Sequence, residues 1–243
     1  MMRLDKLLAT LDVGTRSQVQ KIVRSGAVRV DGNPIKDPGK NIDEKTAEIT
    51  VGGQKLDTRL TRHLMLHKPA GLLTAARDKK QPTVMDLVPS VCSSIGCMPV
   101  GRLDKDTTGL LLLTTDGELN HRLLAPGRHV DKTYYAEVDG QLDENSVKAF
   151  AEGLDLGDFE ASPAALQIIY SEGGRAAARV TIHEGRFHQV KRMFEAVGCM
   201  VTRLHRETFG PLNLENDPAL GEWRELTDEE VRSLYQAAGM ETI

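Results

Sequence analysis

Long apolar segments are missing from this sequence, since no run approaches the ~18–20 residues that a membrane-spanning helix requires. The N-terminal segment is interrupted by Asp5 and Lys6, so it lacks the apolar core of a signal peptide. We therefore expect a cytoplasmic protein that acts away from membranes. The cysteines Cys92, Cys97 and Cys199 are an odd set without Cys-x-x-Cys spacing. They are expected to be free thiols in a reducing compartment and to hold no metal.

Aromatic residues and nucleotide-binding motifs are also scarce. Only 4% of the residues are Phe, Trp or Tyr, so the aromatic platforms usual in sugar-processing enzymes are absent. This scarcity argues against a glycosidase that would use Asp104 and Asp106 as paired carboxylates. No glycine-rich nucleotide-binding loop is present, and no cofactor is expected.

The charge is distributed unevenly along the 243 residues. Residues 1–62 contain twelve basic and eight acidic side chains, a net charge of +4, whereas residues 63–243 have a net charge of −8. A basic segment attached to a larger acidic one suggests that the first binds a polyanion and the second acts more locally. Gly52-Gly53 and the polar stretch up to Arg62 are typical of a linker. We predict two domains, at residues 1–58 and 59–243.

The first domain is expected to contain two short helices and a hairpin. Leucines at i, i+3, i+4 and i+7 from Leu4 form one helical stripe. Thr15 and Gln18 have the spacing of a capping box at the start of a second helix. Asp31-Gly32 is a strong hairpin turn signal after the alternating residues 28–30.

Together with Arg3-Leu4-Asp5-Lys6 and Val28-Arg29-Val30-Asp31-Gly32, this pattern resembles an S4 RNA-binding domain over about residues 2–50. The resemblance implies that duplex or stem-loop RNA is bound through its phosphates. The alternative is that the basic residues only solubilise a small helical cap. The candidate RNA contacts are Arg3, Lys6, Arg16, Lys21, Arg24 and Arg29.

A charged turn stands before a short apolar strand in the second domain. Gly101-Arg102-Leu103-Asp104-Lys105-Asp106-Thr107-Thr108-Gly109 runs directly into four leucines at residues 110–113. Such a turn holds its side chains rigidly while it keeps them near solvent, as a catalytic carboxylate requires. The ordinary alternative is a turn of solvated charges, and Asp106 is assigned to turn formation in either case.

A second informative stretch, Gly185-Arg186-Phe187-His188-Gln189-Val190-Lys191-Arg192-Met193, predicts an amphipathic helix. Its apolar face would contain Val190 and Met193, while His188, Lys191 and Arg192 gather on the opposite face. Gly198 is placed to end the helix. A solvated charged face is the ordinary explanation of the basic residues.

The Gly-Arg-Leu-Asp turn and this helix resemble the RsuA/RluB/RluE/RluF family of pseudouridine synthases. Leu-x-Lys-Pro-x-Gly at residues 66–71 and Lys-Thr-Tyr at 132–134 are similar to further motifs of that family. The resemblance implies an α+β chain, in which the S4 domain precedes a catalytic domain with a mixed, mostly antiparallel sheet flanked by helices. It also implies that Asp104 is the nucleophile, that Tyr134 stacks on the target base and that Lys191 pairs with Asp104. The RNA contacts that it implies in this domain are Arg102, Leu103, Arg186, His188 and Arg192.

The resulting hypothesis is an enzyme that flips a specific uridine out of small-subunit (16S) ribosomal RNA and isomerises it to pseudouridine. The partner would be 16S rRNA or a 30S assembly intermediate, and the protein is expected to be a monomer. Attack at C6 of the base and at C1′ of the ribose both stay open. The alternatives are a large-subunit (23S) rRNA synthase of the same fold and a non-catalytic S4-type ribosome-assembly protein. Under the enzyme hypothesis, Asp104, Tyr134 and Lys191 converge on one cleft, with the ammonium within about 4 Å of the carboxylate.

Overall fold

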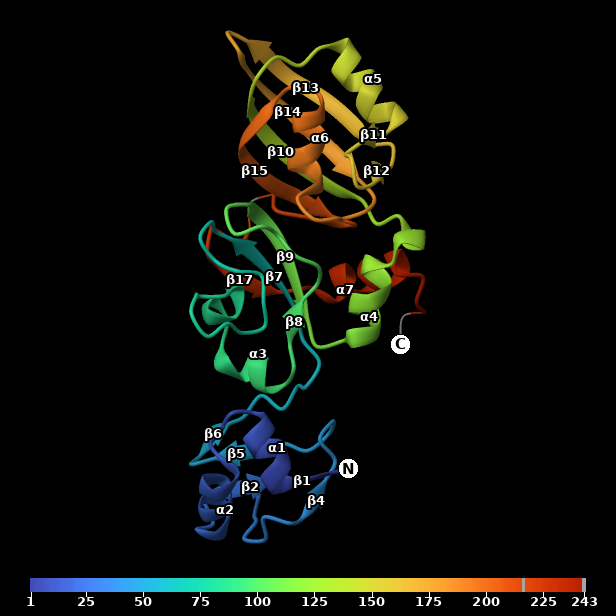
Figure 1. Ribbon diagram of the computed structural model, residues 1–243. Helices are drawn as coiled ribbons and strands as arrows, with labels where there is room; N and C mark the ends of the chain where they lie inside the picture. Colours follow the sequence, from blue (N-terminus) through green and yellow to red (C-terminus); the bar gives the residue numbers. More distant parts are fainter. Residues whose placement is uncertain (216, 242–243) are drawn as a thin grey trace. The chain divides into compact units, whose positions relative to one another are not determined.

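The computed structural model of the protein describes residues 1–215 and 217–241. The chain forms two compact units, and Figure 1 labels their helices and strands. The first unit contains Met1–Arg62 together with Val88–Cys97, and the second contains His63–Leu87 and the chain from Met98 onward. The sequence predicted one boundary, between residues 58 and 59, and did not predict that the segment Val88–Cys97 belongs to the first unit.

The first unit is a small helical and β-stranded module. Its helices are α1 (Leu4–Thr10), α2 (Arg16–Arg24) and α3 (Ser90–Ser94). The strands form a four-stranded sheet in the order β3-β2-β5-β6 and a separate pair, β1-β4. Their bounds are β1 Met2–Arg3, β2 Val28–Val30, β3 Asn33–Pro34, β4 Asn41–Ile42, β5 Ile49–Val51 and β6 Gln54–Lys55.

The predicted leucine stripe and capping box are both present in this unit. Leu4, Leu7 and Leu8 are fully buried in one core with residues of α2 and the sheet. Thr15 accepts a hydrogen bond from the backbone N–H of Gln18, whose side chain accepts from the backbone N–H of Thr15. The added segment is held by the same core, because Val91 and Ile95 pack against it.

A mixed, mostly antiparallel sheet dominates the second unit, as the sequence predicted. Its strand order is β13-β14-β10-β15-β9-β7-β17, with β16 paired to β15 and β8 paired to β9. Among the strand pairings of this sheet within the described residues, that of β15 with β9 alone is parallel. The bounds are β7 His63–Lys68, β8 Met98–Pro99, β9 Thr108–Thr114, β10 Lys132–Asp139, β13 Ala165–Glu172, β14 Arg175–Ile182, β15 Met200–Phe209, β16 Leu212–Asn213 and β17 Trp223–Glu225.

Helices cover the two halves of this sheet separately (Figure 1). The helices α5 (Glu144–Glu152) and α6 (Gln189–Ala196) pack on the β13–β15 half, where Phe150 and Phe194 meet with ring centroids 5.2 Å apart. In the β9–β7 half, α4 (Gly117–Leu124) and α7 (Asp228–Ala237) share one apolar core with the strands. The remaining elements are the 3-10 helices η1 Val84–Leu87 and η2 Pro126–Arg128 and the hairpin strands β11 Leu154–Asp155 and β12 Glu160–Ala161.

The two halves of the sheet meet at the short parallel contact between β9 and β15. In this contact, His205 pairs with Thr108 and Arg206 pairs with Gly109. Gly109 has φ +113°, and a Cβ added there would lie 2.3 Å from the carbonyl oxygen of Arg206. The Arg206 side chain is buried and donates from Nε to the carbonyl of Leu110 at 2.8 Å. The final glycine of the charged motif therefore allows the two backbones to approach.

The substitution Gly109→Ala should open this junction, because its methyl group would overlap backbone atoms that cannot rotate away. We expect the free energy of unfolding to fall by about 3 kcal/mol or more, measured by urea denaturation. Gly173→Ala is the matched control, since Gly173 also has a positive φ of +60° but would place its Cβ in open space. Equal losses in the two variants would show that backbone strain alone, and no close approach, makes Gly109 necessary.

The stability of the fold should depend on pH through His63, at the start of β7. Its side chain is 9% exposed, and its Nδ1 atom lies 2.9 Å from the hydroxyl oxygen of Thr114. Burial lowers the pKa of His63, and the nearby Asp116 carboxylate only partly opposes this shift. In the unfolded chain His63 therefore binds a proton near pH 6.5, whereas in the folded chain it is still neutral at that pH. The free energy of unfolding consequently decreases as the pH falls below this value.

We expect the unfolding free energy of the wild type to fall more steeply than that of His63→Gln between about pH 7.5 and 5.5. The difference in slope cannot exceed about 1.4 kcal/mol per pH unit for one group. Chemical denaturation across this range measures it. Parallel curves for the two proteins would show that His63 titrates alike in the folded and unfolded states.

Candidate active site

A buried lysine binds the backbone of the charged turn at residues 101–109. Lys68, at the end of β7, is fully buried, and its Nζ lies 3.0 Å from the carbonyl oxygen of Asp104 and 2.8 Å from that of Thr107. The carbonyls of Lys105 at 3.3 Å and Pro69 at 3.1 Å complete its surroundings. Burial lowers the pKa of Lys68 to about 8, against the opposing effect of the Asp106 and Asp104 carboxylates. One ammonium group thus donates hydrogen bonds to several backbone carbonyls of the turn.

The other side of the turn is held by the segment that follows Lys68. The hydroxyl of Thr74 donates to the carbonyl of Leu103 at 2.7 Å and accepts from the Leu103 backbone N–H at 3.2 Å. The backbone N–H of Gly71 donates to the carbonyl of Lys105 at 2.7 Å. Asp104 therefore projects from a backbone that is fixed on both sides. From the sequence, Lys68 was singled out only as part of the Leu-x-Lys-Pro-x-Gly motif, with no contact predicted for its side chain, and no role was predicted for Thr74.

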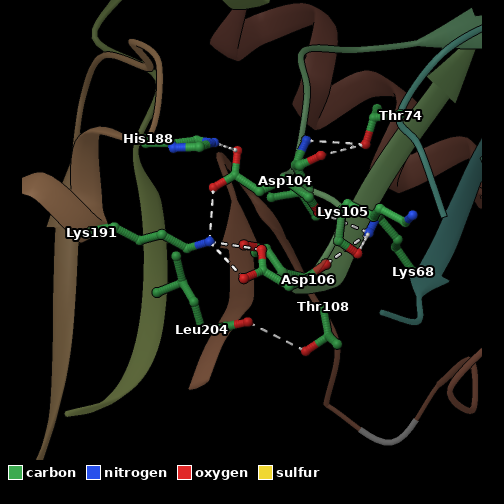
Figure 2. Close-up of polar contacts among 11 residues, drawn as sticks. Lys68, Thr74, Asp104, Lys105, Asp106, Thr108, His188, Lys191 and Leu204 are labelled. Carbon is green, nitrogen blue, oxygen red and sulfur yellow. Dashed lines mark hydrogen bonds and ion pairs between the residues drawn. The ribbon is translucent and has the colours of Figure 1, made fainter. Parts of the chain in front are cut away.

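Figure 2 shows how the charged side chains meet above this turn. The ammonium of Lys191, on α6, lies 3.3 Å from Oδ2 of Asp104, within the predicted distance. It lies closer to Asp106, at 2.7 Å from Oδ1 and 2.9 Å from Oδ2. Nε2 of His188 is 3.5 Å from the other oxygen of Asp104. Two carboxylates therefore share one lysine, and Asp104 has a basic group beside each of its oxygens.

The contact of Asp106 was not predicted, because the sequence suggested for it only a role in the turn. Its hydrogen bonds with Lys191 lower the pKa of the Asp106 carboxyl, so it remains ionised in the folded protein. The side chain of Asp106 is 73% exposed, whereas that of Asp104 is 27% exposed. Asp104 is thus the more enclosed of the two carboxylates.

Asp104, Lys191 and Tyr134 line one pocket, together with apolar atoms of Leu204 and Val190. Tyr134 lies on β10 with 7% of its surface exposed, and Tyr135 follows on the opposite face of the strand. The pocket places a carboxylate, the ammonium of Lys191 and a flat aromatic ring around one cavity. Chemically, this set can supply a nucleophile or ion-pair partner to a planar ring.

The predicted RNA contacts of this unit separate into two groups. Arg102, Leu103, Arg186 and His188 line the same pocket as Asp104. Arg192 does not, because its guanidinium binds the carboxylate of Asp158 and the carbonyl of Leu156. That side chain fastens α6 to the β11–β12 hairpin, and its role in RNA binding stays a prediction.

The six basic candidates of the S4-like segment lie in the first unit and are all exposed. Arg3 and Arg16 both pair with Asp5, a fully buried carboxylate. The hydrogen bond from Arg3 is the main cause that holds the pKa of Asp5 far below its usual value. Arg29 donates to the carbonyl of Gly32 at 3.0 Å. The others are Lys6, Lys21 and Arg24.

Within residues 1–215 and 217–241, no cluster of three or more His, Cys, Asp or Glu side chains is arranged to hold a metal ion. The same part of the chain contains no helix with the length and apolar character needed to cross a membrane.

Comparison with known proteins connects this geometry to a family. A sequence model described as RNA pseudouridylate synthase matches residues 62–196, and one described as S4 domain matches residues 2–47. The chain is 43% identical to an uncharacterized RNA pseudouridine synthase of Bacillus subtilis, YtzG, over 97% of this chain and 99% of the relative. It is 42% identical to the ribosomal small subunit pseudouridine synthase A of Pseudomonas aeruginosa, over 96% of this chain and 100% of that protein.

Two further comparisons agree. The ribosomal large subunit pseudouridine synthase B of Bacillus subtilis is 36% identical over 98% of this chain and 97% of its own length. A crystal structure of a pseudouridylate synthase matches with a TM-score of 0.67 at 36% identity, covering 96% of this chain and 100% of that chain. The resemblance seen in the sequence motifs is therefore confirmed over nearly the whole chain. The protein belongs to the RNA pseudouridylate synthase family and carries an N-terminal S4 domain.

Proposed function

We propose that this protein isomerises a specific uridine of 16S ribosomal RNA to pseudouridine, with Asp104 as the nucleophile. The observation that carries the proposal is the convergence of Asp104, Tyr134 and Lys191 on one pocket from three separate elements. Similarity to the small-subunit synthase at 42% identity favours 16S rRNA, whereas the large-subunit relative at 36% keeps 23S rRNA as the alternative.

The reaction breaks the C1′–N1 bond, turns the uracil ring and forms a C1′–C5 bond. The hydrogen at C5 leaves as a proton and N1 gains one, so neither a redox partner nor a group donor is consumed. In our proposal, Asp104 attacks C1′ or C6 and forms a temporary covalent bond to the ribose or to the uracil, and this bond breaks again once C1′ is joined to C5. Lys191 balances the negative charge of Asp104, and Tyr134 stacks on the uracil after it leaves the RNA helix.

Binding of the RNA is assigned to both domains. Residues 1–58 would hold phosphate groups through their exposed arginines and lysines, which recovers the few kcal/mol that flipping the base costs. Arg102, Arg186 and His188 would contact the RNA around the flipped nucleotide, since they line the pocket of Asp104. We place the protein in the cytoplasm as a monomer that acts on 16S rRNA or on an assembling 30S particle.

The proposal is tested with transcribed 16S and 23S rRNA that carry tritium at C5 of uridine. The wild type should release tritium from 16S rRNA, or from 30S particles, and the variant Asp104→Asn should release none. The variant should bind the same RNA with nearly unchanged affinity, because the amide has the shape of the carboxylate and lacks its nucleophilicity. Release from 23S rRNA alone would support the large-subunit alternative. Turnover by Asp104→Asn would remove Asp104 from the nucleophilic role.

The shared lysine leads to a second prediction. Lys191→Met should lower kcat by about 10²–10³-fold, because two carboxylates would be left without their cation. Asp106→Asn should lower kcat by no more than about fivefold, since the Asp106 carboxylate is mostly exposed and Lys191 can still pair with Asp104. Single-turnover kinetics on the same RNA give both values, with thermal unfolding as the control for folding. A larger loss in Asp106→Asn than in Lys191→Met would assign the essential pairing to Asp106.

A further inference from the structure

A second hollow adjoins the pocket of Asp104 and has no role in the mechanism described above. It is lined by Leu73–Ala75, by Gly101–Lys105 and by Glu184–His188. Arg102, Leu103 and Asp104 line both cavities, so the hollow opens beside the position proposed for the flipped uridine. Whatever occupies it would therefore be a direct neighbour of the reacting base.

Phe187 is the unusual residue of this hollow. Of the five phenylalanines in the chain, three are fully buried and Phe159 is partly covered by two arginines. Phe187, in contrast, is 69% exposed. Packing in the protein therefore does not account for a large apolar side chain at this position.

The ring of Phe187 is nevertheless fixed in orientation. It stacks on the imidazole of His188 with ring centroids 3.8 Å apart and an angle of 18° between the planes. His188 in turn faces Asp104 at 3.5 Å. One face of the Phe187 ring is therefore covered by His188, and the opposite face is available to a ligand.

The turn that carries Phe187 is braced by hydrogen bonds at its base. The side chain of Gln189 accepts from the backbone N–H of Arg186 at 3.0 Å and donates to Glu184 at 2.7 Å. Glu184 also accepts from the backbone N–H of Ser162 at 2.9 Å. A braced turn presents an aromatic surface that loses little conformational freedom when a flat ligand binds.

The charges around Phe187 indicate the chemistry of that ligand. Arg102 is exposed, and within the described part of the chain its guanidinium forms no hydrogen bond or ion pair. The side chain of Arg186 is 58% exposed, and Lys105 lies in the same lining. These basic groups stand out in a unit whose overall charge is negative. A flat aromatic surface bordered by cations fits a nucleotide, whose base stacks while its phosphate pairs with the arginines.

We propose that Phe187 is the stacking surface for the base of the nucleotide next to the target uridine. This inference rests on the proposed function, because it places the stacked base beside Asp104. Phe187 acts as a positioning residue in it. Stacking holds the flanking nucleotide out of the RNA helix and so keeps the neighbouring uridine accessible to the pocket.

The test begins by locating the uridine that the wild type modifies in transcribed 16S and 23S rRNA. A synthetic RNA around that site is then used with the variants Phe187→Leu and Phe187→Trp. Leucine keeps the apolar character and removes the ring, so we expect KM to rise about 5- to 150-fold with little change in kcat. Tryptophan should keep KM near the wild-type value. Tyr170→Leu is the matched control, because Tyr170 is another exposed aromatic residue, on β13, that does not line the hollow.

A second set of RNAs identifies the partner of the ring. Each RNA lacks one base beside the target uridine, on the 5′ or the 3′ side. For one of these RNAs, wild type and Phe187→Leu should have equal KM values, because the stacked base is already gone. The inference would be overturned if Phe187→Leu had an unchanged KM on the intact RNA. It would also be overturned if the KM of Phe187→Leu exceeded that of the wild type by the same factor on every abasic RNA. Either result would leave the proposed function intact. No tritium release by the wild type from either rRNA would refute the proposed function, and the inference with it.

Discussion

The buried ammonium of Lys68 is the interaction on which the candidate site depends. Three of its four carbonyl partners belong to the turn that carries Asp104 and Asp106, so the lysine fixes the backbone from which both carboxylates project. Hydrogen bonds of this kind to a charged group contribute about 1.5–3 kcal/mol each. They oppose a desolvation cost that is visible in the lowered pKa of Lys68, about 8. A neutral side chain of the same length would leave the carbonyls without a partner and the turn without its fixed shape.

The parallel contact between β9 and β15 is the second constraint, because it sets the position of α6 relative to that turn. Gly109 belongs to the turn and strand that present Asp104, and Arg206 belongs to the strand that follows α6. Their close backbone approach brings Lys191 to within 3.3 Å of Asp104. The short pairing thus joins the half of the sheet that carries the carboxylates to the half that carries the cation and Tyr134.

Charge and aromatic surface are concentrated where the proposed reaction needs them. The chain as a whole has a net charge of −4. Around Asp104, however, Lys191 and His188 lie within 3.5 Å of the carboxylate, and Arg102 is exposed nearby. The chain also buries three of its five phenylalanines and leaves Phe187 exposed beside the same carboxylate. A polyanion with flat bases is the ligand class that such a distribution matches.

Local sequence patterns determined several elements of the fold. The capping box at Thr15, the leucine strand after Gly109 and the amphipathic α6 depend on neighbours only a few residues away, and the structure has all three. One detail was wrong: α6 begins at Gln189, so His188, which was predicted on its polar face, precedes the helix in a left-handed backbone conformation. The family motifs, which also lie in short stretches, were sufficient to recognise a pseudouridine synthase. They identified Asp104, Tyr134 and Lys191 as candidates, and these residues line one pocket in the structure.

Tertiary packing alone decided which polar and charged groups contact one another at the site. Lys68 binds carbonyls 36 to 39 residues ahead in the chain, and Asp106 meets Lys191 across 85 residues. Likewise, Val88–Cys97 packs with the first unit although it follows the start of the second. No periodicity or turn signal encodes such contacts, because they depend on where the sheet places its strand ends. The sequence therefore specified the reactive groups, while the packing of the sheet and of α6 specified which charges they share.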